Sequence, residues 1–182
     1  METLHESGEI IAERYRIIDT LGRGGVGITY GAEDLESKKR VALKVLSLRR
    51  MTDWKNLELF EREAKVLAQL NHPDIPHYLD YFQTDSDGDR CFYIAQELAP
   101  GDSLAVLVEN GWQPDETKVQ LVAVRILAIL VYLQSLTPPV IHRDIKPSNI
   151  IRSENGQIFL VDFGAVVDSY RHTVAGGSTV SS

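Results

Sequence analysis

The sequence is poor in cysteine, in basic residues and in repeats, and each shortage argues against a class of protein. Its 182 residues hold one cysteine, Cys91, which rules out an internal disulfide and is typical of a reducing compartment. Acidic residues outnumber basic ones, 26 to 19, so a general nucleic-acid-binding surface is not expected. There are no repeats and no low-complexity segments apart from a small-residue tail at 175–182. We therefore expect a cytoplasmic protein that does not bind nucleic acid.

Long hydrophobic runs are also missing. The longest apolar stretch, residues 119–133, is interrupted by Gln120 and Arg125 and is shorter than the ~20 residues that a membrane span needs. The amino-terminal METLHESGEI has neither a basic start nor an apolar core, so no signal peptide is predicted. The composition, 43% hydrophobic and 25% charged, is ordinary for a globular domain, and we interpret 119–133 as a buried helix without a membrane role.

The most informative stretch is residues 140–164, VIHRDIKPSNIIRSENGQIFLVDFG. Two short apolar runs, 150–151 and 158–161, flank a polar turn, which predicts a β-hairpin. The HRD triplet precedes this hairpin and the DFG triplet follows it. The two triplets should therefore lie on the same side of the hairpin.

The polar residues on this hairpin suit phosphoryl transfer, which needs cations and in-line positioning more than covalent chemistry. Asn149 and Asp162 offer the oxygen ligands that magnesium prefers. Asp144 can accept the proton of an attacking hydroxyl, and Lys146 can neutralise charge on the transferred phosphate.

A glycine-rich segment near the amino terminus has the spacing G-x-G-x-x-G. Gly22, Gly24 and Gly27 follow a predicted strand at 15–21, and glycine lets the backbone approach phosphates closely. The spacing also occurs in Rossmann folds, where a helix follows. Here the next residues, ITYGAE at 28–33, are β-branched and aromatic, so a second strand is predicted and a Rossmann dinucleotide enzyme is set aside.

A lysine and a glutamate stand out in the next two predicted elements. Lys44 follows apolar neighbours in a strand at 40–47. Glu63 falls within the apolar stripe of a helix at 52–70, where an unpaired carboxylate would be costly. Pairing Glu63 with Lys44 removes this anomaly.

The HRDIKPSN and DFG motifs together resemble the catalytic core of eukaryotic-type (Hanks-type) protein kinases, in a bacterial style, and the Lys-Pro pair resembles the serine/threonine branch. The resemblance implies a two-lobed α+β fold with a complete five-stranded N-lobe, one main helix and an incomplete helical C-lobe. It divides the chain into an extension at 1–14, the N-lobe at 15–96, a hinge at 97–101 and a partial C-lobe at 102–182.

The resemblance also implies ATP and Mg²⁺ as ligands and Ser/Thr hydroxyls of a protein as the substrate. Asp144 and Lys146 would be catalytic, together with the Lys44–Glu63 pair. Asn149 and Asp162 would be the metal ligands. The nucleotide site implied by the resemblance is formed by Leu21, Gly22, Gly24, Gly27, Thr29, Ala42, Lys44, Glu97, Ala99 and Ile151.

The sequence departs from the family after the DFG triplet, because no Ala-Pro-Glu motif and no further helices follow. We therefore expect an exposed apolar face on the 119–133 helix, covered by self-association or by a partner. An alternative function is a nucleotide-binding scaffold without activity of its own. The intact catalytic positions favour an enzyme, and the missing helices favour the scaffold.

Regulation by phosphorylation is a further expectation from the resemblance. In the family, the arginine at the position of Arg143 holds a phosphorylated activation segment, because a phosphate orders a loop through arginine contacts. The candidate acceptors in this sequence are Thr173, Ser178 and Thr179.

Overall fold

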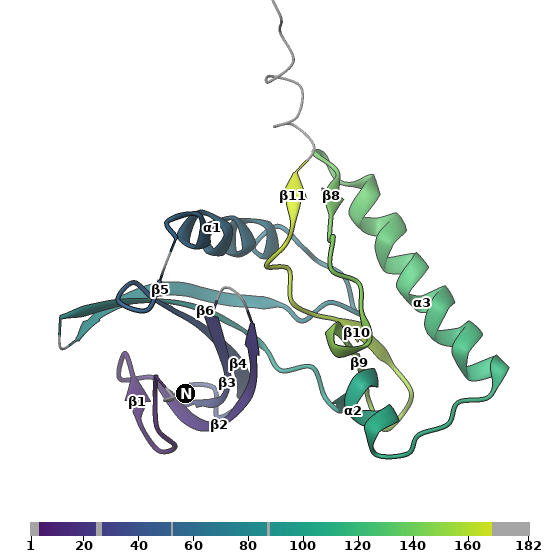
Figure 1. Cartoon of the computed structure of the whole chain (residues 1–182), viewed down its shortest axis with the longest axis horizontal. Coiled ribbons are helices and arrows are strands. Elements are labelled where there is room, and N and C mark those ends of the chain that lie inside the picture. Colours follow the sequence, from purple (N-terminus) through teal and green to yellow (C-terminus); the bar gives the residue numbers. More distant parts are fainter. Residues whose placement is uncertain (1–3, 25–26, 52, 87, 169–182) are drawn as a thin grey trace, which may run out of the picture.

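The computed structural model describes residues 4–24, 27–51, 53–86 and 88–168, which form a strand-rich lobe and a more helical lobe (Figure 1). The strand-rich lobe is an antiparallel sheet in the order β1-β2-β3-β4-β6-β5. Its strands are β1 (Ile10–Ile11), β2 (Tyr15–Gly24), β3 (Gly27–Asp34), β4 (Arg40–Ser47), β5 (Tyr78–Ser86) and β6 (Asp89–Glu97). The two-lobed α+β fold predicted from the sequence is confirmed.

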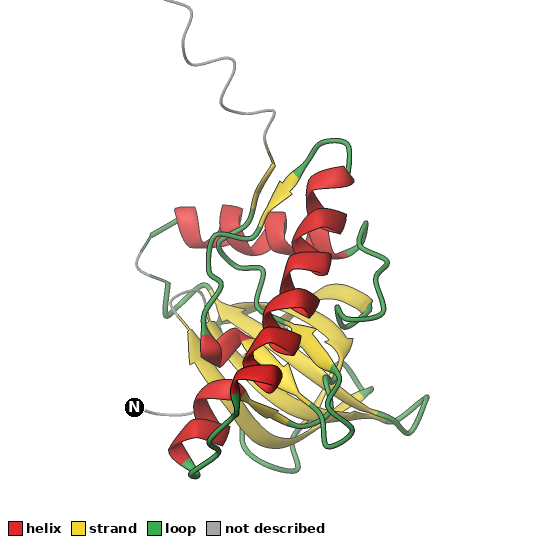
Figure 2. Cartoon of the chain, turned by 90° about the vertical axis from the view of Figure 1, so that its right-hand side faces the viewer, coloured by secondary structure: helices red, strands yellow, loops and turns green. Residues whose placement is uncertain are grey.

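The first strand, β1, adds a sixth member to the five predicted strands. It pairs with the start of β2, Ile10 opposite Arg16 and Ile11 opposite Tyr15. Ile11 and Tyr15 are buried in an apolar cluster inside the curled sheet. This pairing attaches the amino-terminal segment to the six-stranded sheet, whose curled strands are drawn in yellow in Figure 2.

Helix α1 (Lys55–Leu67) is shorter than the predicted 52–70 at both ends. It lies over the sheet beside β5 (Figure 1). Its buried face consists of Phe60, Glu63, Ala64, Val66 and Leu67, so the apolar stripe read from the sequence is the packed face. Glu63 is thereby held toward the sheet.

The second lobe contains short paired strands and three helical segments. The elements in chain order are β7 (Asp102–Ser103), α2 (Leu104–Glu109), α3 (Glu116–Ser135), β8 (Val140–Ile141), the 3₁₀ turn η1 (Pro147–Asn149), β9 (Ile150–Arg152), β10 (Ile158–Leu160) and β11 (Val167–Asp168). The predicted hairpin is β9–β10, in which Ile150 faces Leu160 across the ladder. β9 also pairs with β7, which anchors the chain just after the predicted hinge at 97–101.

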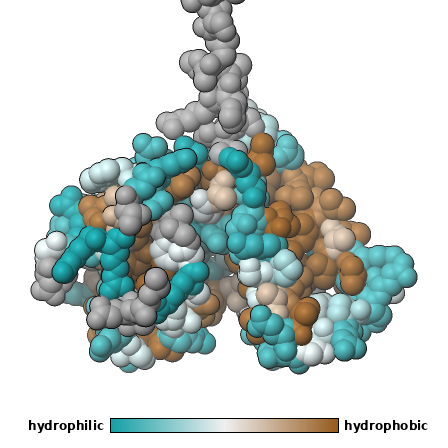
Figure 3. Space-filling model, viewed as in Figure 1, coloured by the Kyte–Doolittle hydropathy of each residue, from teal (hydrophilic) through white to brown (hydrophobic). Residues whose placement is uncertain are grey.

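Helix α3 corrects the interpretation of 119–133 as a buried helix. The buried side chains are Ile126, Ile129 and Leu133. The opposite face is also apolar and is exposed, with large side chains between 51% and 69% accessible at Val119, Leu121, Val124, Leu127 and Val131. Figure 3 shows this apolar surface over α3. The exposed face predicted for this helix is therefore present. Within the described residues, no helix is long and apolar enough to span a membrane.

Candidate active site

The predicted Lys44–Glu63 ion pair is present between β4 and α1. Lys44 Nζ lies 2.8 Å from both carboxylate oxygens of Glu63. The Glu63 side chain is 1% exposed and that of Lys44 is 13% exposed. A buried charge needs a partner and hydrogen bonds, and each of these two residues supplies both to the other.

Asp162 joins this pair from the far end of the chain. Its Oδ1 accepts a hydrogen bond from Lys44 Nζ at 2.8 Å and another from the Gly164 N–H at 3.3 Å. Both bonds use the same carboxylate oxygen, and among the described residues no hydrogen bond is made to Oδ2. The lysine thus ties the strand-rich lobe, α1 and the segment after β10 together.

The electrostatics of this group depend on burial and on the lysine. Burial opposes the charged form of Lys44, but Glu63 and Asp162 outweigh it and raise the lysine pKa above its usual value. Burial raises the pKa of Glu63, with Lys44 acting against it. Burial would also raise the pKa of Asp162, yet Lys44 outweighs it and holds that pKa below its usual value.

The loop that follows β8 carries the second cluster of candidate residues. Lys146 Nζ lies 2.8 Å from Asp144 Oδ2. Asn149 donates from Nδ2 to the Asp144 carbonyl at 2.9 Å and to Asp144 Oδ2 at 3.0 Å. The amide nitrogen of Asn149 therefore orients Asp144. The amide oxygen of Asn149, Oδ1, accepts one long hydrogen bond from Ser148 Oγ at 3.5 Å.

His142 connects the two clusters and is 1% exposed. Its Nε2 lies 3.2 Å from the Val161 carbonyl, and its Nδ1 accepts the Asp144 N–H at 3.3 Å, which assigns the neutral ring with the proton on Nε2. The ring also meets Phe163 edge-on at 4.6 Å between centroids. Burial lowers the histidine pKa. His142 is therefore a packed structural residue of this site.

Two of the site residues have an unusual backbone. Arg143 has φ of 67° and Asp162 has φ of 61°, a region that non-glycine residues rarely occupy. Such conformations persist where surrounding contacts enforce them, and they cluster at functional sites. Here the contacts of His142 and Lys44 surround the two strained positions.

The glycine-rich segment forms the ends of β2 and β3, and residues 25–26 between them lie outside the described residues. Gly24 pairs with Gly27 across the ladder. A Cβ on Gly27 would lie 2.2 Å from the Val45 carbonyl oxygen, and its φ is 151°. Gly27 must therefore be glycine for β3 to approach β4, whereas a Cβ on Gly22 would meet nothing within 4 Å.

The residues implied for the adenine side lie on the strands nearest the hinge. Thr29 pairs with Lys44, and Ala42 pairs with Gln96. The Glu97 N–H donates to the His77 carbonyl at 2.9 Å, which leaves only its carbonyl to meet an adenine. Ala99 and Ile151 are half-buried, and Leu21 is exposed. Figure 3 shows a hollow between the two lobes.

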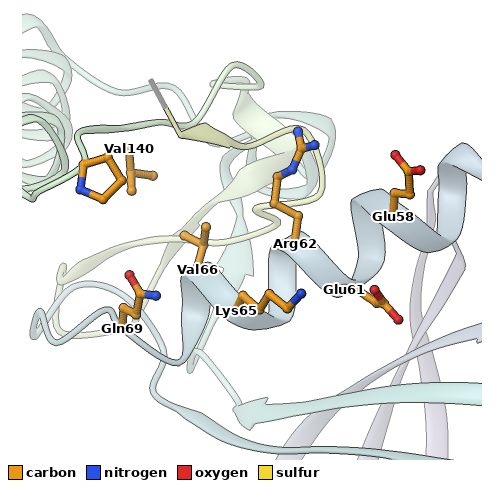
Figure 4. Close-up of a pocket in the computed structure, with 8 residues that line it drawn as sticks. Glu58, Glu61, Arg62, Lys65, Val66, Gln69 and Val140 are labelled. Carbon is orange, nitrogen blue, oxygen red and sulfur yellow. The ribbon is translucent and has the colours of Figure 1, made fainter. Parts of the chain in front are cut away.

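A cavity of about 400 Å³ lies elsewhere, between α1 and the segment before the catalytic loop (Figure 4). Figure 4 shows the labelled side chains of α1 pointing away from the helix in different directions, with Val140 on the opposite side of the cavity. Its lining consists of Glu58, Glu61, Arg62, Lys65, Val66, Gln69, Pro138 and Val140. None of the predicted site residues is among them, and the acidic and basic groups balance in number. The cavity is therefore separate from the candidate site.

Some expectations fall outside the described residues, and some contacts were not anticipated. Thr173, Ser178 and Thr179 lie outside the described residues. The direct Lys44–Asp162 bond was not predicted, because nothing in a sequence pattern indicates a contact over that separation. The buried Asp74 and its partner Gln157 were also missed, since neither belongs to a motif.

A glycine-rich hairpin over one lobe and a catalytic-loop aspartate on the other define the class of two-lobed, nucleotide-dependent phosphotransferases. Comparison with protein families agrees with this class. The family model described as "Protein kinase domain" matches residues 15–179, and the chain belongs to this family.

Curated relatives are named serine/threonine-protein kinases and are bacterial among the most similar. Serine/threonine-protein kinase B of Synechocystis sp. is 41% identical over 160 residues, which cover 84% of this chain and 27% of the relative. PknA of Nostoc sp. is 36% identical over 88% of this chain and 29% of its own length. Pkn3 of Myxococcus xanthus is 34% identical over 86% of this chain and 28% of its own length. The chain thus spans less than a third of these relatives.

Proposed function

We propose that this chain binds ATP with Mg²⁺ between its lobes and directs the γ-phosphate to a Ser or Thr hydroxyl of a protein. Protein kinases in general use this reaction. The observation that carries the proposal is the Lys44–Glu63–Asp162 network, in which one ammonium contacts two carboxylates from different parts of the fold at 2.8 Å. A lysine so placed can contact nucleotide phosphates while Glu63 holds it.

Asp144 and Lys146 would act at the transferred group. The Asp144 side chain is 34% exposed, so a substrate hydroxyl can reach it, and Asn149 fixes its orientation. The carboxylate would accept the hydroxyl proton as the oxygen attacks the γ-phosphorus, and the bond between that phosphorus and the bridging oxygen would break to release ADP. Lys146, half-exposed beside it, would neutralise charge on the phosphoryl oxygens, and its contact with Asp144 raises its own pKa and keeps it protonated.

The donor set beside the catalytic loop fits magnesium. Mg²⁺ is commonly bound through one or two carboxylates plus substrate phosphates and waters, so a cluster of protein carboxylates is not required. Oδ2 of Asp162 and Oδ1 of Asn149 are the oxygens that would hold it. When bound, the metal neutralises phosphate charge.

A scaffold without activity is the second candidate, and the exposed apolar face of α3 favours it. Large contiguous apolar patches mark interaction sites. We propose that this face is covered in the working protein by a second copy or by another polypeptide. The single cysteine, Cys91, is buried and unpaired, which supports the cytoplasm as the proposed location.

Transfer of labelled phosphate from ATP to a general protein substrate tests the two candidates against each other. We expect transfer that requires Mg²⁺ and is lost in Asp144→Asn, with Glu154→Gln on the exposed hairpin turn as the matched control. The same assay on a version extended to the length of the curated relatives separates the candidates. Transfer by the extended version alone supports the scaffold reading for this chain, and Asp144-independent transfer contradicts the proposed mechanism.

A further inference from the structure

The loop between α1 and β5 is clamped to the β9–β10 hairpin through a buried carboxylate. Asp74, in this loop, is 7% exposed. Its Oδ1 accepts a hydrogen bond from Gln157 Nε2 at 3.1 Å, and the same amide nitrogen lies 3.3 Å from the Pro73 carbonyl. Gln157 stands in the turn of the hairpin, immediately before β10. One side-chain amide therefore holds two acceptors of the loop.

The backbone continues this clamp toward the candidate metal ligands. The Leu160 N–H donates to the Asp74 carbonyl at 3.0 Å, and the next amide, Val161 N–H, donates to the Asn149 carbonyl at 3.0 Å. Asp162 follows directly. Consecutive peptide groups thus tie the strand that leads to Asp162 to the loop after α1 and to the asparagine of the catalytic loop.

The two residues that precede Pro73 and Asp74 in the α1–β5 loop contact α3. The Asn71 N–H donates to the Tyr132 hydroxyl at 2.7 Å, and the His72 ring packs on the Tyr132 ring at 5.0 Å. Four consecutive residues of the loop that follows α1, 71–74, are therefore bound to the second lobe, although α1 itself packs on the sheet of the first lobe. A helix anchored in this way transmits the position of the hairpin to Glu63.

We infer that Gln157 is a positioning residue: through Asp74 it sets α1 relative to the hairpin that carries Asn149 and Asp162, and so keeps Glu63, Lys44 and Asp162 in contact. The inference rests on the proposed function. Gln157 itself would contact neither the nucleotide nor the metal. The donor character of its amide is what matters, because both groups that it faces are acceptors.

Three substitutions at this position separate donor chemistry from shape. Gln157→Glu keeps the shape but places an acceptor against the Asp74 carboxylate and the Pro73 carbonyl. It should weaken Mg²⁺-dependent ATP binding about ten-fold, while binding measured in EDTA should fall less, because it loses the Lys44 contact but not the metal ligand Asp162. Gln157→Lys supplies a donor again and should recover the affinity. Gln157→Ala removes the donor without adding charge, and it gives the same readout if the glutamate variant does not fold.

Gln120→Glu is the matched control, because Gln120 Nε2 also donates to a carboxylate, that of Glu116 at 3.0 Å, on the exposed surface of α3. It should leave both affinities unchanged. If the unmodified chain shows no Mg²⁺-dependent ATP binding, the proposed function fails. If it binds and Gln157→Glu binds equally, the inference alone fails. Equal weakening with and without Mg²⁺, or no recovery in Gln157→Lys, would mean a merely structural role and would also overturn it.

Discussion

Replacing Lys44 by methionine is the sharpest perturbation of the candidate site. Methionine keeps the length of the side chain but removes the ammonium that contacts both oxygens of Glu63. The glutamate cannot turn to solvent, because its side chain is 1% exposed in the packed face of α1. Lys44→Met therefore leaves a buried carboxylate without its cation.

Breaking a buried ion pair by removing one partner costs about 3–5 kcal/mol. We expect the low end, about 3 kcal/mol at pH 8, because Lys44 is partly exposed and Glu63 can take up a proton. Burial already raises the pKa of Glu63, and losing Lys44 raises it further. The penalty is fully present above the raised folded-state pKa. It disappears as the pH falls toward about 4.3, the unfolded-state value, where Glu63 is protonated in both states.

Urea unfolding followed by circular dichroism at pH 8 and pH 5 measures the loss of stability in Lys44→Met and its dependence on pH. Lys44→Met should lose stability mainly at pH 8, and Lys44→Met with Glu63→Gln should recover part of the loss, because no buried charge remains. Lys65→Met, an exposed lysine on the same helix, is the matched control. A loss of stability below about 0.5 kcal/mol at pH 8, the range of surface substitutions, would show that the Glu63 charge does not depend on Lys44. A loss of stability that does not depend on pH would show that the charge of Glu63 is not its cause.

Three further predictions concern other parts of the structure. The neutral, buried His142 has a lowered pKa, so below pH 6.5 the unfolded state binds a proton that the folded state does not. The free energy of unfolding should fall on acidification by up to about 1.4 kcal/mol per pH unit. His142→Phe should flatten this pH dependence in a series of urea unfolding curves. An unchanged slope would contradict the assignment of His142 as a neutral, buried ring. Gly27→Ala forces a Cβ against backbone and should cost about 2 kcal/mol of stability, whereas Gly22→Ala should be near neutral; equal effects would show that the close approach is not needed. If a second copy covers the exposed face of α3, light scattering should show association of the chain, reduced by Leu127→Glu with Val131→Glu. A monomeric unmodified chain would exclude the second copy as the cover.

The sequence was most informative where a residue type conflicted with its surroundings or matched a specific motif. Glu63 in an apolar stripe predicted its pairing with Lys44, because a buried carboxylate needs a cation. The β9–β10 hairpin followed from two apolar runs around a polar turn. Strand β1 was not predicted, because its two residues are too few to show alternation.

Tertiary contacts over long separations could not be read from local patterns. Lys44 and Asp162 are 118 residues apart, and their bond depends on how the two lobes meet. The clamp of Gln157 on Asp74 likewise joins a turn to a distant loop. Apolar residues all round 119–133 predicted a buried helix, yet periodicity cannot tell which face another element covers, and in this chain one face of α3 is exposed.

Calorimetric titration of the chain with ATP, in Mg²⁺ and then in EDTA, measures metal-dependent nucleotide binding at the candidate site. We expect tighter ATP binding in Mg²⁺, with the difference lost in Asp162→Ala because that carboxylate supplies a metal ligand. Glu154→Ala, which removes an exposed carboxylate in the hairpin turn, should keep the difference. Equal ATP affinity with and without Mg²⁺ in the unmodified chain would contradict the proposed magnesium-dependent ATP site. An unchanged metal dependence in Asp162→Ala would contradict the role of Asp162 as a metal ligand.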